Sequence, residues 1–444
     1  MPPIRDSEME AVVAAPSSPS SNGPLRTSQA WYSGVPGYAW AALAIAALGW
    51  MFDTMDQHLF NLVRQESVTQ LLSPHVSSAA LDSAAKGLAA QLTAIFLLGW
   101  AVGGAFFGIV GDRIGRTRTM MLTICIYALF TGLNGLARTP FEYGLCRFLT
   151  AIGVGGEFAA GAALVAEVWP ERSRPYALGV LQATSGLGNI VASFITLALS
   201  SVSWRWAYAV GAAPALLVLW IRSKVPEPKR WQMARAATAG DTNNRPLGSI
   251  RSLLQDRQLR RNTAAGILLT LAGVGGVWGV AFFLPDLVGS ALKPIVAASP
   301  AMRALELHHR AAAVAHAVQA YRSKVSLIQQ IGAMLGMLAY PVLSQRTGRR
   351  PALLAGFLLA FLSVEITFRC LNSVASAYIL AFPLGFFCLM PFSGYAVYFP
   401  ELYPTRLRAT GIGLCYNCAR FLAAAAPALQ GRLAQHFADP ADAT

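Results

Sequence analysis

The stretch Gly111-Asp112-Arg113-Ile114-Gly115-Arg116-Thr117-Arg118 leaves one apolar hairpin, and Ser344-Gln345-Arg346-Thr347-Gly348-Arg349-Arg350 leaves another roughly half a chain length later. A second pair repeats in the same order and at nearly the same spacing. Pro170-Glu171-Arg172-Ser173-Arg174 precedes one apolar run, and the stretch from Pro400 to Arg408 precedes another. Paired halves embedded in apolar sequence indicate a membrane protein built from an internal repeat.

The composition supports a bilayer environment. Of the 444 residues, 55% are hydrophobic and only 13% are charged, whereas roughly a quarter of the residues of a soluble chain are charged. The formal charge of +14 comes from basic residues scattered through short loops, which argues against nucleic-acid binding. The six cysteines all fall in apolar runs, where they are expected to be packing residues.

The chain is predicted to be an all-α membrane protein with two helical bundles. Residues 1–36 are rich in Pro, Ser and Ala and predict a disordered tail. Residues 37–222 predict a six-helix bundle, and residues 223–261 a basic linker. Residues 262–444 predict a bundle of about five helices with an outer loop at 290–323, which gives about eleven spans of ~20 residues each. A design of six plus six would then lack its last helix, because the tail after residue 431 is short and polar.

Arginines and lysines concentrate in the loops that carry the signatures and in the basic linker. The positive-inside rule therefore places the N-terminus, the signatures and the linker on the cytoplasmic side. We expect a multi-pass protein of a bacterial inner membrane, in contact with the lipid bilayer.

The first repeat, from Gly108 to Arg118, resembles the loop signature of the major facilitator superfamily, a glycine followed by Asp-Arg-x-Gly-Arg. The stretch from Val225 to Trp231 is similar to the Pro-Glu-Ser-Pro-Arg-Trp sequence that ends the sixth helix in the sugar-porter branch. The stretch from Arg147 to Glu157 resembles the fourth helix of proton-coupled carboxylate symporters of the sialate and lactate/pyruvate types. The resemblance implies two pseudo-symmetric bundles that work as a monomer by alternating access, without a cofactor.

The recurrence and the resemblance predict a gating role for the signature loops. Glycines let helix ends approach closely, and Asp112 can form charge-assisted hydrogen bonds with arginines or with a helix N-terminus. Gln345 replaces this aspartate in the second copy, so its charge interaction should be weaker. The predicted gating residues are Gly108, Asp112, Arg113, Gly115, Arg116, Glu171, Arg174, Arg346, Gly348, Arg349, Glu401 and Arg408. The alternative is that these charges only anchor the loops on the inner side.

Acidic residues inside the apolar runs predict a proton-coupling site. Asp53 and Asp56 lie three residues apart in the first run and therefore on one helical face. A charge at the bilayer centre costs ~3 kcal/mol or more, so each should face a cavity or a partner. Glu157 in the fourth run, next to two glycines, is a further candidate proton carrier. A structural ion pair or a hydrogen-bonding role is the alternative for each.

Two intramembrane arginines are candidate substrate ligands. Arg147 could bind an anion or pair with Asp53 or Asp56 across helices, and Arg420 has no acidic neighbour in sequence, which favours a carboxylate clamp. Polar residues that could line a cavity are Gln182, Asn189, Gln329, Gln330 and Asn417. For these, ordinary hydrogen bonding between helices is the alternative.

No phosphate-binding loop of the form G-x-x-x-x-G-K-[ST] occurs, which excludes ATP-driven transport by this chain alone. No spacing predicts a metal site, a nucleophile–base pair or a cofactor. The sequence therefore favours proton symport of a small organic anion or a sugar-like metabolite. A proton-independent facilitator or efflux antiporter, and a membrane receptor that does not transport, are the alternatives.

Overall fold

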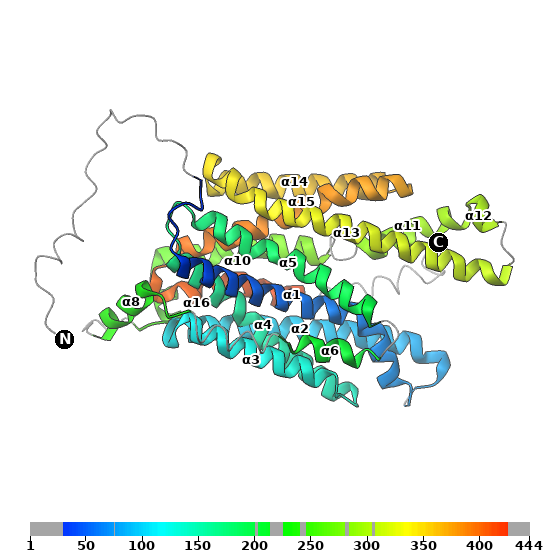
Figure 1. Ribbon diagram of the computed structural model, residues 1–444, viewed down its shortest axis with the longest axis horizontal. Helices are drawn as coiled ribbons and strands as arrows, with labels where there is room; N and C mark the ends of the chain where they lie inside the picture. Colours follow the sequence, from blue (N-terminus) through cyan, green and yellow to red (C-terminus); the bar gives the residue numbers. More distant parts are fainter. Residues whose placement is uncertain are drawn as a thin grey trace, which may run out of the picture. The chain divides into compact units, whose positions relative to one another are not determined.

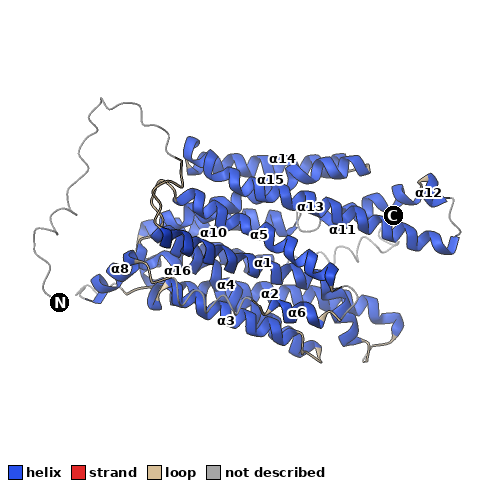
Figure 2. Ribbon diagram, in the orientation of Figure 1, coloured by secondary structure: helices blue, strands red, loops and turns tan. Residues whose placement is uncertain are grey.

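The computed structural model describes residues 30–74, 76–199, 203–213, 225–239, 246–279, 284–303 and 307–424. The chain divides into a short unit, Met1–Gly34, and a compact unit, Val35–Thr444. Every regular element of the described residues is a helix, as Figure 2 shows. The prediction of an all-α protein is confirmed. Most of the predicted N-terminal tail lies outside the described residues.

The first set of helices precedes the linker. It consists of α1 (Gly37–Leu72), α2 (Ser78–Ile114), α3 (Arg116–Asn134), α4 (Pro140–Val168), α5 (Arg174–Ala198) and α6 (Arg205–Gly211). The start of α4 illustrates how local sequence sets these bounds. The Thr139 hydroxyl accepts a hydrogen bond from the Glu142 amide, and the Glu142 carboxylate accepts one from the Thr139 amide. Pro140 occupies the first helical position, where its missing N–H costs nothing.

The linker and the second set follow. The linker contains α8 (Lys229–Ala239) and α9 (Ile250–Gln255). The second set consists of α10 (Arg257–Gly279), α11 (Leu284–Ala297), α12 (Pro300–Arg303), α13 (Leu307–Thr347), α14 (Arg349–Cys370), α15 (Val374–Tyr398), the 3₁₀ turns η4 (Phe399–Leu402) and η5 (Thr405–Leu407), and α16 (Arg408–Ala423).

Each set has an apolar core of its own. One core joins α1, α2, α4, α5 and α6 around Leu59, Tyr143 and Tyr208. Another joins α11, α13 and α15 around Val288 and Leu384. The two sets also pack against each other, because α16 of the second set contacts both α2 and α4 of the first, which Figure 1 shows side by side.

Seven described helices are long and apolar enough to cross a bilayer, namely α1, α2, α4, α5, α13, α14 and α15 together with η4. The sequence predicted about eleven spans. Part of the difference arises because α6 has 7 described residues and α16 has 16, fewer than the ~20 that a span requires. Residues 214–222, which end the predicted six-helix bundle, and the chain after residue 424 lie outside the described residues.

The segment predicted as an outer loop, residues 290–323, is largely helical. It contains the end of α11, all of α12 and the start of α13. Leu292, Val314 and Val318 of this segment belong to the apolar core of the second set. The polar and histidine-containing residues of the segment suggested a loop, whereas its spaced apolar residues stabilise helices that extend that core.

Candidate functional site

The turn between α2 and α3 requires a glycine. Gly115 has a backbone φ of 116°, a conformation that residues with a Cβ rarely adopt. The Glu227 carboxylate caps the start of α3 by accepting hydrogen bonds from the amides of Arg116 at 2.7 Å and Arg118 at 2.9 Å. The linker thereby holds the first signature loop, since the Trp231 indole also donates to the Asp112 carbonyl at 2.7 Å.

Asp112 caps the N-terminus of α16, across the boundary between the two sets. Its carboxylate accepts hydrogen bonds from the amides of Ala409 at 3.1 Å and Thr410 at 2.9 Å, and from the Thr410 hydroxyl at 2.6 Å. An anion is favourable at the positive end of a helix. Asp112 also pairs with Arg116 one turn later, at 3.0 Å, and both side chains are fully buried.

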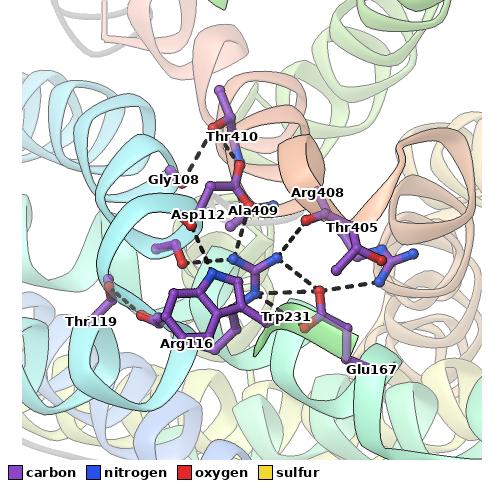
Figure 3. A network of polar contacts seen from close by, with 12 residues as sticks. Gly108, Asp112, Arg116, Thr119, Glu167, Trp231, Thr405, Arg408, Ala409 and Thr410 are labelled. Atoms are coloured by element: carbon purple, nitrogen blue, oxygen red, sulfur yellow. Dashed lines mark hydrogen bonds and ion pairs between the residues drawn. The ribbon is translucent and has the colours of Figure 1, made fainter. Parts of the chain in front are cut away.

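Arg116 lies at the centre of the network in Figure 3. Its guanidinium donates to the Glu167 carboxylate at 2.8 Å and to the Thr405 carbonyl of η5 at 2.7 Å. Glu167, at the end of α4, also accepts a hydrogen bond from Arg408 at 3.1 Å. One buried glutamate therefore holds an arginine from each set, and the network joins α2, α3 and α4 to η5 and α16.

The second signature has the same turn and a similar ion pair. Gly348 has a φ of 91°, and Arg349 pairs with Glu401 at 3.0 Å in a partly exposed position. Gln345 is exposed, as is Arg346, so Gln345 does not take the buried capping position of Asp112. The second copy is consequently the weaker one, in line with the expectation from the sequence.

The structure gives the predicted gating residues unequal surroundings. Arg113 and Glu171 are exposed, and the ion pairs of Glu171 with described residues are loose, with Arg174 at 3.6 Å and Arg230 at 3.8 Å. The sequence had singled out Glu171 in the first half, but Glu167, one helical turn earlier, occupies the buried network. Close approach of the sets is visible at Gly108, where an added Cβ would lie 2.7 Å from the Ala409 carbonyl.

Arg147 and Asp56 form a buried ion pair inside the first set. The guanidinium of Arg147 on α4 lies 3.0 Å from the Asp56 carboxylate on α1, with both side chains fully buried. Asp56 also accepts a hydrogen bond from the Thr131 hydroxyl of α3 at 2.8 Å. The rings of Phe60 and Phe96 cover the guanidinium at 4.4 and 4.3 Å. Of the partners that the sequence left open for Arg147, the structure brings Asp56 into contact.

Asp53 and Glu157 both lie in the interior of the first set without such a cation. Each is 1% exposed, and Asp53 interacts electrostatically with Glu157 and Asp56. Glu157 accepts a hydrogen bond from the Thr123 hydroxyl at 2.9 Å. Within the described residues, neither oxygen of Asp53 has a hydrogen-bond partner. The absent side chain of Gly49 makes room for Glu157, because a Cβ there would lie 2.1 Å from its Oε1.

Arg420 lies on α16 where the two sets meet. It is 2% exposed and donates a hydrogen bond to the Asn417 side-chain oxygen at 3.0 Å. Its guanidinium lies over the rings of Trp100 at 4.0 Å and Tyr416 at 4.7 Å. In the described part of the chain no carboxylate forms an ion pair with Arg420, and its Nε has no hydrogen-bond partner.

Aromatic rings from both sets surround this arginine. Tyr416 stacks on Phe158 of α4 at 4.0 Å and approaches Trp50 of α1 at 6.2 Å. Phe392 and Tyr395 of α15 complete the group, each 6.3 Å from Tyr416. We call Trp50, Trp100, Phe158, Phe392, Tyr395 and Tyr416 the aromatic cluster.

The predicted polar lining residues are only partly brought together. Gln182 of α5 is buried and interacts with the Tyr416 side chain, which neighbours Asn417 in the sequence. Asn189 is half-buried two turns further along α5, and Gln329 and Gln330 lie on α13. The roles of these three residues stay predictions.

Sequence reasoning missed Glu167 and the aromatic cluster. An acidic residue in the last turn of an otherwise apolar helix was the available signal for Glu167. No comparable signal existed for the cluster, because aromatic residues are spread through every apolar run. Among the described residues no group of three His, Cys, Asp or Glu side chains could hold a metal ion.

Comparisons with known proteins place these features in context. The profile of the Major Facilitator Superfamily matches residues 35–302. The chain is 30% identical over 395 residues to a probable 4-methylmuconolactone transporter of Cupriavidus pinatubonensis, covering 88% of this chain and 82% of the relative. It is 29% identical over 349 residues to the cis,cis-muconate transport protein of Acinetobacter baylyi, covering 78% of each chain. A solved structure of the proton:xylose symporter XylE is similar with a TM-score of 0.63 and 17% identity, covering 89% of both chains. The resemblance expected from the signature loops is confirmed.

Proposed function

Because the chain belongs to the Major Facilitator Superfamily of membrane transporters, we propose that it carries a small organic carboxylate across the membrane together with protons. We place it in a bacterial inner membrane with the signature loops on the cytoplasmic side, since these loops and the linker carry most of the basic residues. It would work by alternating access around the boundary between the two helix sets.

Arg420 is the observation that carries this proposal. A buried guanidinium without a counter-ion is costly in an apolar environment. A substrate carboxylate would supply the missing charge and could accept two parallel hydrogen bonds from the planar fork. The described residues offer Arg420 only neutral partners, Asn417 and the main chain of Tyr416. This arrangement favours an anion over an uncharged sugar.

The aromatic cluster supports a substrate with a flat or apolar body. Trp50, Trp100 and Phe158 come from the first set, whereas Tyr416 comes from the second. A ligand between them would contact both sets at once, so its binding would favour an arrangement in which the sets close around it. The two relatives are named for muconate and a muconolactone, and muconate is an unsaturated organic anion.

The buried carboxyl groups of the first set support proton coupling. Asp56 is neutralised by Arg147, and Asp53 and Glu157 lie in the same interior without an ion-pair partner among the described residues. A buried acid that has no cation can exist in its neutral form, which is what a proton carrier requires. Coupling would arise if these groups gain a proton from one side of the membrane and lose it to the other.

The decisive experiment measures uptake in proteoliposomes that contain the purified protein. An inwardly directed proton gradient should drive accumulation of some members of a panel of radiolabelled carboxylates, including muconate, and of no neutral sugar. Collapsing the gradient should abolish accumulation. Arg420→Gln should abolish both uptake and binding. Flux that ignores the gradient would instead favour a facilitator or an antiporter, and ligand binding without flux would favour a receptor.

A further inference from the structure

One face of α3 carries three hydroxyl side chains that point into the interior of the first set. Thr123, Tyr127 and Thr131 follow one another at four-residue spacing, and each is fully buried. Thr123 donates to Glu157 and Thr131 donates to Asp56. Tyr127, between them, interacts electrostatically with Asp53, Glu157 and Asp56. This face of α3 therefore lies along the group of buried acids, with Thr123 at Glu157 and Thr131 at Asp56.

The three carboxyl groups have different electrostatic surroundings. Asp56 has the Arg147 guanidinium at 3.0 Å, so its negative charge is compensated. Asp53 and Glu157 have no arginine or lysine bonded to either carboxyl within the described ranges. The titratable groups that face them are Asp56 on α1, with its partner Arg147 on α4, and Tyr127 on α3.

Two uncompensated carboxylates cannot easily coexist in such an interior. The energy of each charge rises on burial, and like charges at short distance raise it further. A proton held by one of the two carboxyls removes the repulsion between like charges and the burial penalty of one charge, and the one remaining charge is distributed over the pair, as in other buried carboxyl pairs. The unpartnered oxygens support this arrangement, since both Asp53 oxygens, the Glu157 Oε1 and the Tyr127 hydroxyl lack hydrogen-bond partners within the described residues.

We propose that Asp53 and Glu157 form one two-carboxyl site that holds a single exchangeable proton, and that Tyr127, which lies on α3 between the threonines bonded to Glu157 and to Asp56, is a positioning residue for this site. The inference rests on the proposed proton coupling and says where its proton resides. No bond other than O–H changes. The proton is taken up from water on one side, is held between the two carboxyls, and is released to water on the other side.

Infrared spectroscopy of the purified protein counts the proton directly. The variants are Asp53→Asn, Glu157→Gln and the double variant, whose spectrum is subtracted as the background. A shared proton predicts that the C=O band of the protonated acid has the same area in the wild type as in each single variant, because a lone buried acid keeps its proton. A wild-type band twice as large would mean two independent protons, and no wild-type band would mean an ionised pair. Either result overturns the proposal.

Transport assays test whether that proton is the coupled one. Each single variant should lose proton-driven accumulation by at least roughly 10-fold yet keep substrate exchange within about 2-fold, because exchange does not require the proton to leave. The retained exchange also shows that the variant is folded. Accumulation that survives in either single variant would contradict a shared site.

Tyr127→Phe tests the positioning role. It should slow proton-driven uptake several-fold and shift its pH profile, while exchange and the infrared band area are unchanged. Tyr403→Phe is the matched control, since Tyr403 is also buried but its hydroxyl contacts Thr263 at 2.9 Å, outside the acidic group. Identical pH profiles for Tyr127→Phe and the wild type would remove Tyr127 from the proposal. If the wild type accumulates nothing under a proton gradient, the proposed function fails, whereas the band areas still decide whether the pair shares a proton.

Discussion

Replacing Asp112 with asparagine tests whether this buried carboxylate holds the two helix sets together at the signature loops. Asn has nearly the same shape but no charge, and one carboxylate oxygen becomes an amide group that donates. The variant therefore loses the attraction to Arg116 at 3.0 Å and the interaction of an anion with the N-terminus of α16. It also places an amide donor against the Ala409 amide, which in the unaltered protein donates a hydrogen bond to Asp112 at 3.1 Å.

The expected magnitude follows from the contacts that are lost. A hydrogen bond to a charged group contributes about 1.5 to 3 kcal/mol, and Asn retains an acceptor for Thr410. We expect the closed arrangement at the signature loops to lose about 2 to 3 kcal/mol relative to the open one, which corresponds to a roughly 30- to 150-fold shift of the equilibrium.

Alkylation of a cysteine at Thr405 measures this shift. Thr405 is half-buried in η5, and only its main chain takes part in the network. The six native cysteines are first replaced by serine, and the reagent is a membrane-impermeant maleimide added to inside-out vesicles. Asp112→Asn should raise the alkylation rate at least roughly 10-fold, and Arg118→Gln, which removes an exposed charge of the same loop, should not. Equal rates for Asp112→Asn and its parent would refute the gating role of Asp112.

Other substitutions probe separate parts of the structure. Arg420→Lys keeps the charge but loses the planar fork and the contacts with Trp100 and Tyr416, so KM for the carboxylate substrate should rise roughly 10-fold; an unchanged KM would exclude a substrate contact. Glu167→Gln should lower stability in detergent by about 3 kcal/mol, because it leaves the buried Arg116 and the largely buried Arg408 without their shared carboxylate. Glu171→Gln should change stability by less than about 0.5 kcal/mol, because Glu171 is 78% exposed, and equal effects of the two variants would contradict the network. Gly115→Ala should lower the Tm more than Gly348→Ala. Both positions have a positive φ, but only the added Cβ at position 115 would overlap a carboxylate, at 2.3 Å from Glu227 Oε1. The reverse order of the two Tm values would contradict this steric argument and show that Glu227 moves away.

The sequence predicts the parts of this structure that depend on local repetition. The two signature turns, their glycines with positive φ and the weaker second copy all follow from a motif that occurs twice with one aspartate replaced by Gln345. Charged residues inside apolar runs can also be recognised from the sequence as candidate site residues, because an acid or an arginine in the membrane needs a partner or a function. Asp56, Arg147 and Arg420 were accessible to that reasoning.

Contacts between distant helices were not predictable in the same way. Glu167 and Glu171 are four residues apart in the sequence, but α4 ends at Val168 between them, and only the packing of this helix end against α3 and α16 decides which of them meets Arg116. The same holds for the choice between Asp53 and Asp56 as the partner of Arg147. The aromatic cluster depends on residues from five helices, and none of their sequence positions distinguishes them from other aromatic residues in apolar runs.

The positions of the acids and the aromatic cluster suggest how a proton and a substrate can be coupled without touching. Neighbouring residues of α1 point to the two sites: Gly49 approaches Glu157, and Trp50 packs against Phe158 at 4.8 Å. On α4 the next residue after Glu157 is Phe158, which stacks on Tyr416 beside Arg420. A change in spacing between α1 and α4 on proton loss would therefore displace the rings beside Arg420. Two sites are coupled when both bias the equilibrium of one structural element, and the α1–α4 contact can be such an element because neighbouring residues of each helix reach the two sites. A substrate that contacts the rings would in turn favour one protonation state of the acids.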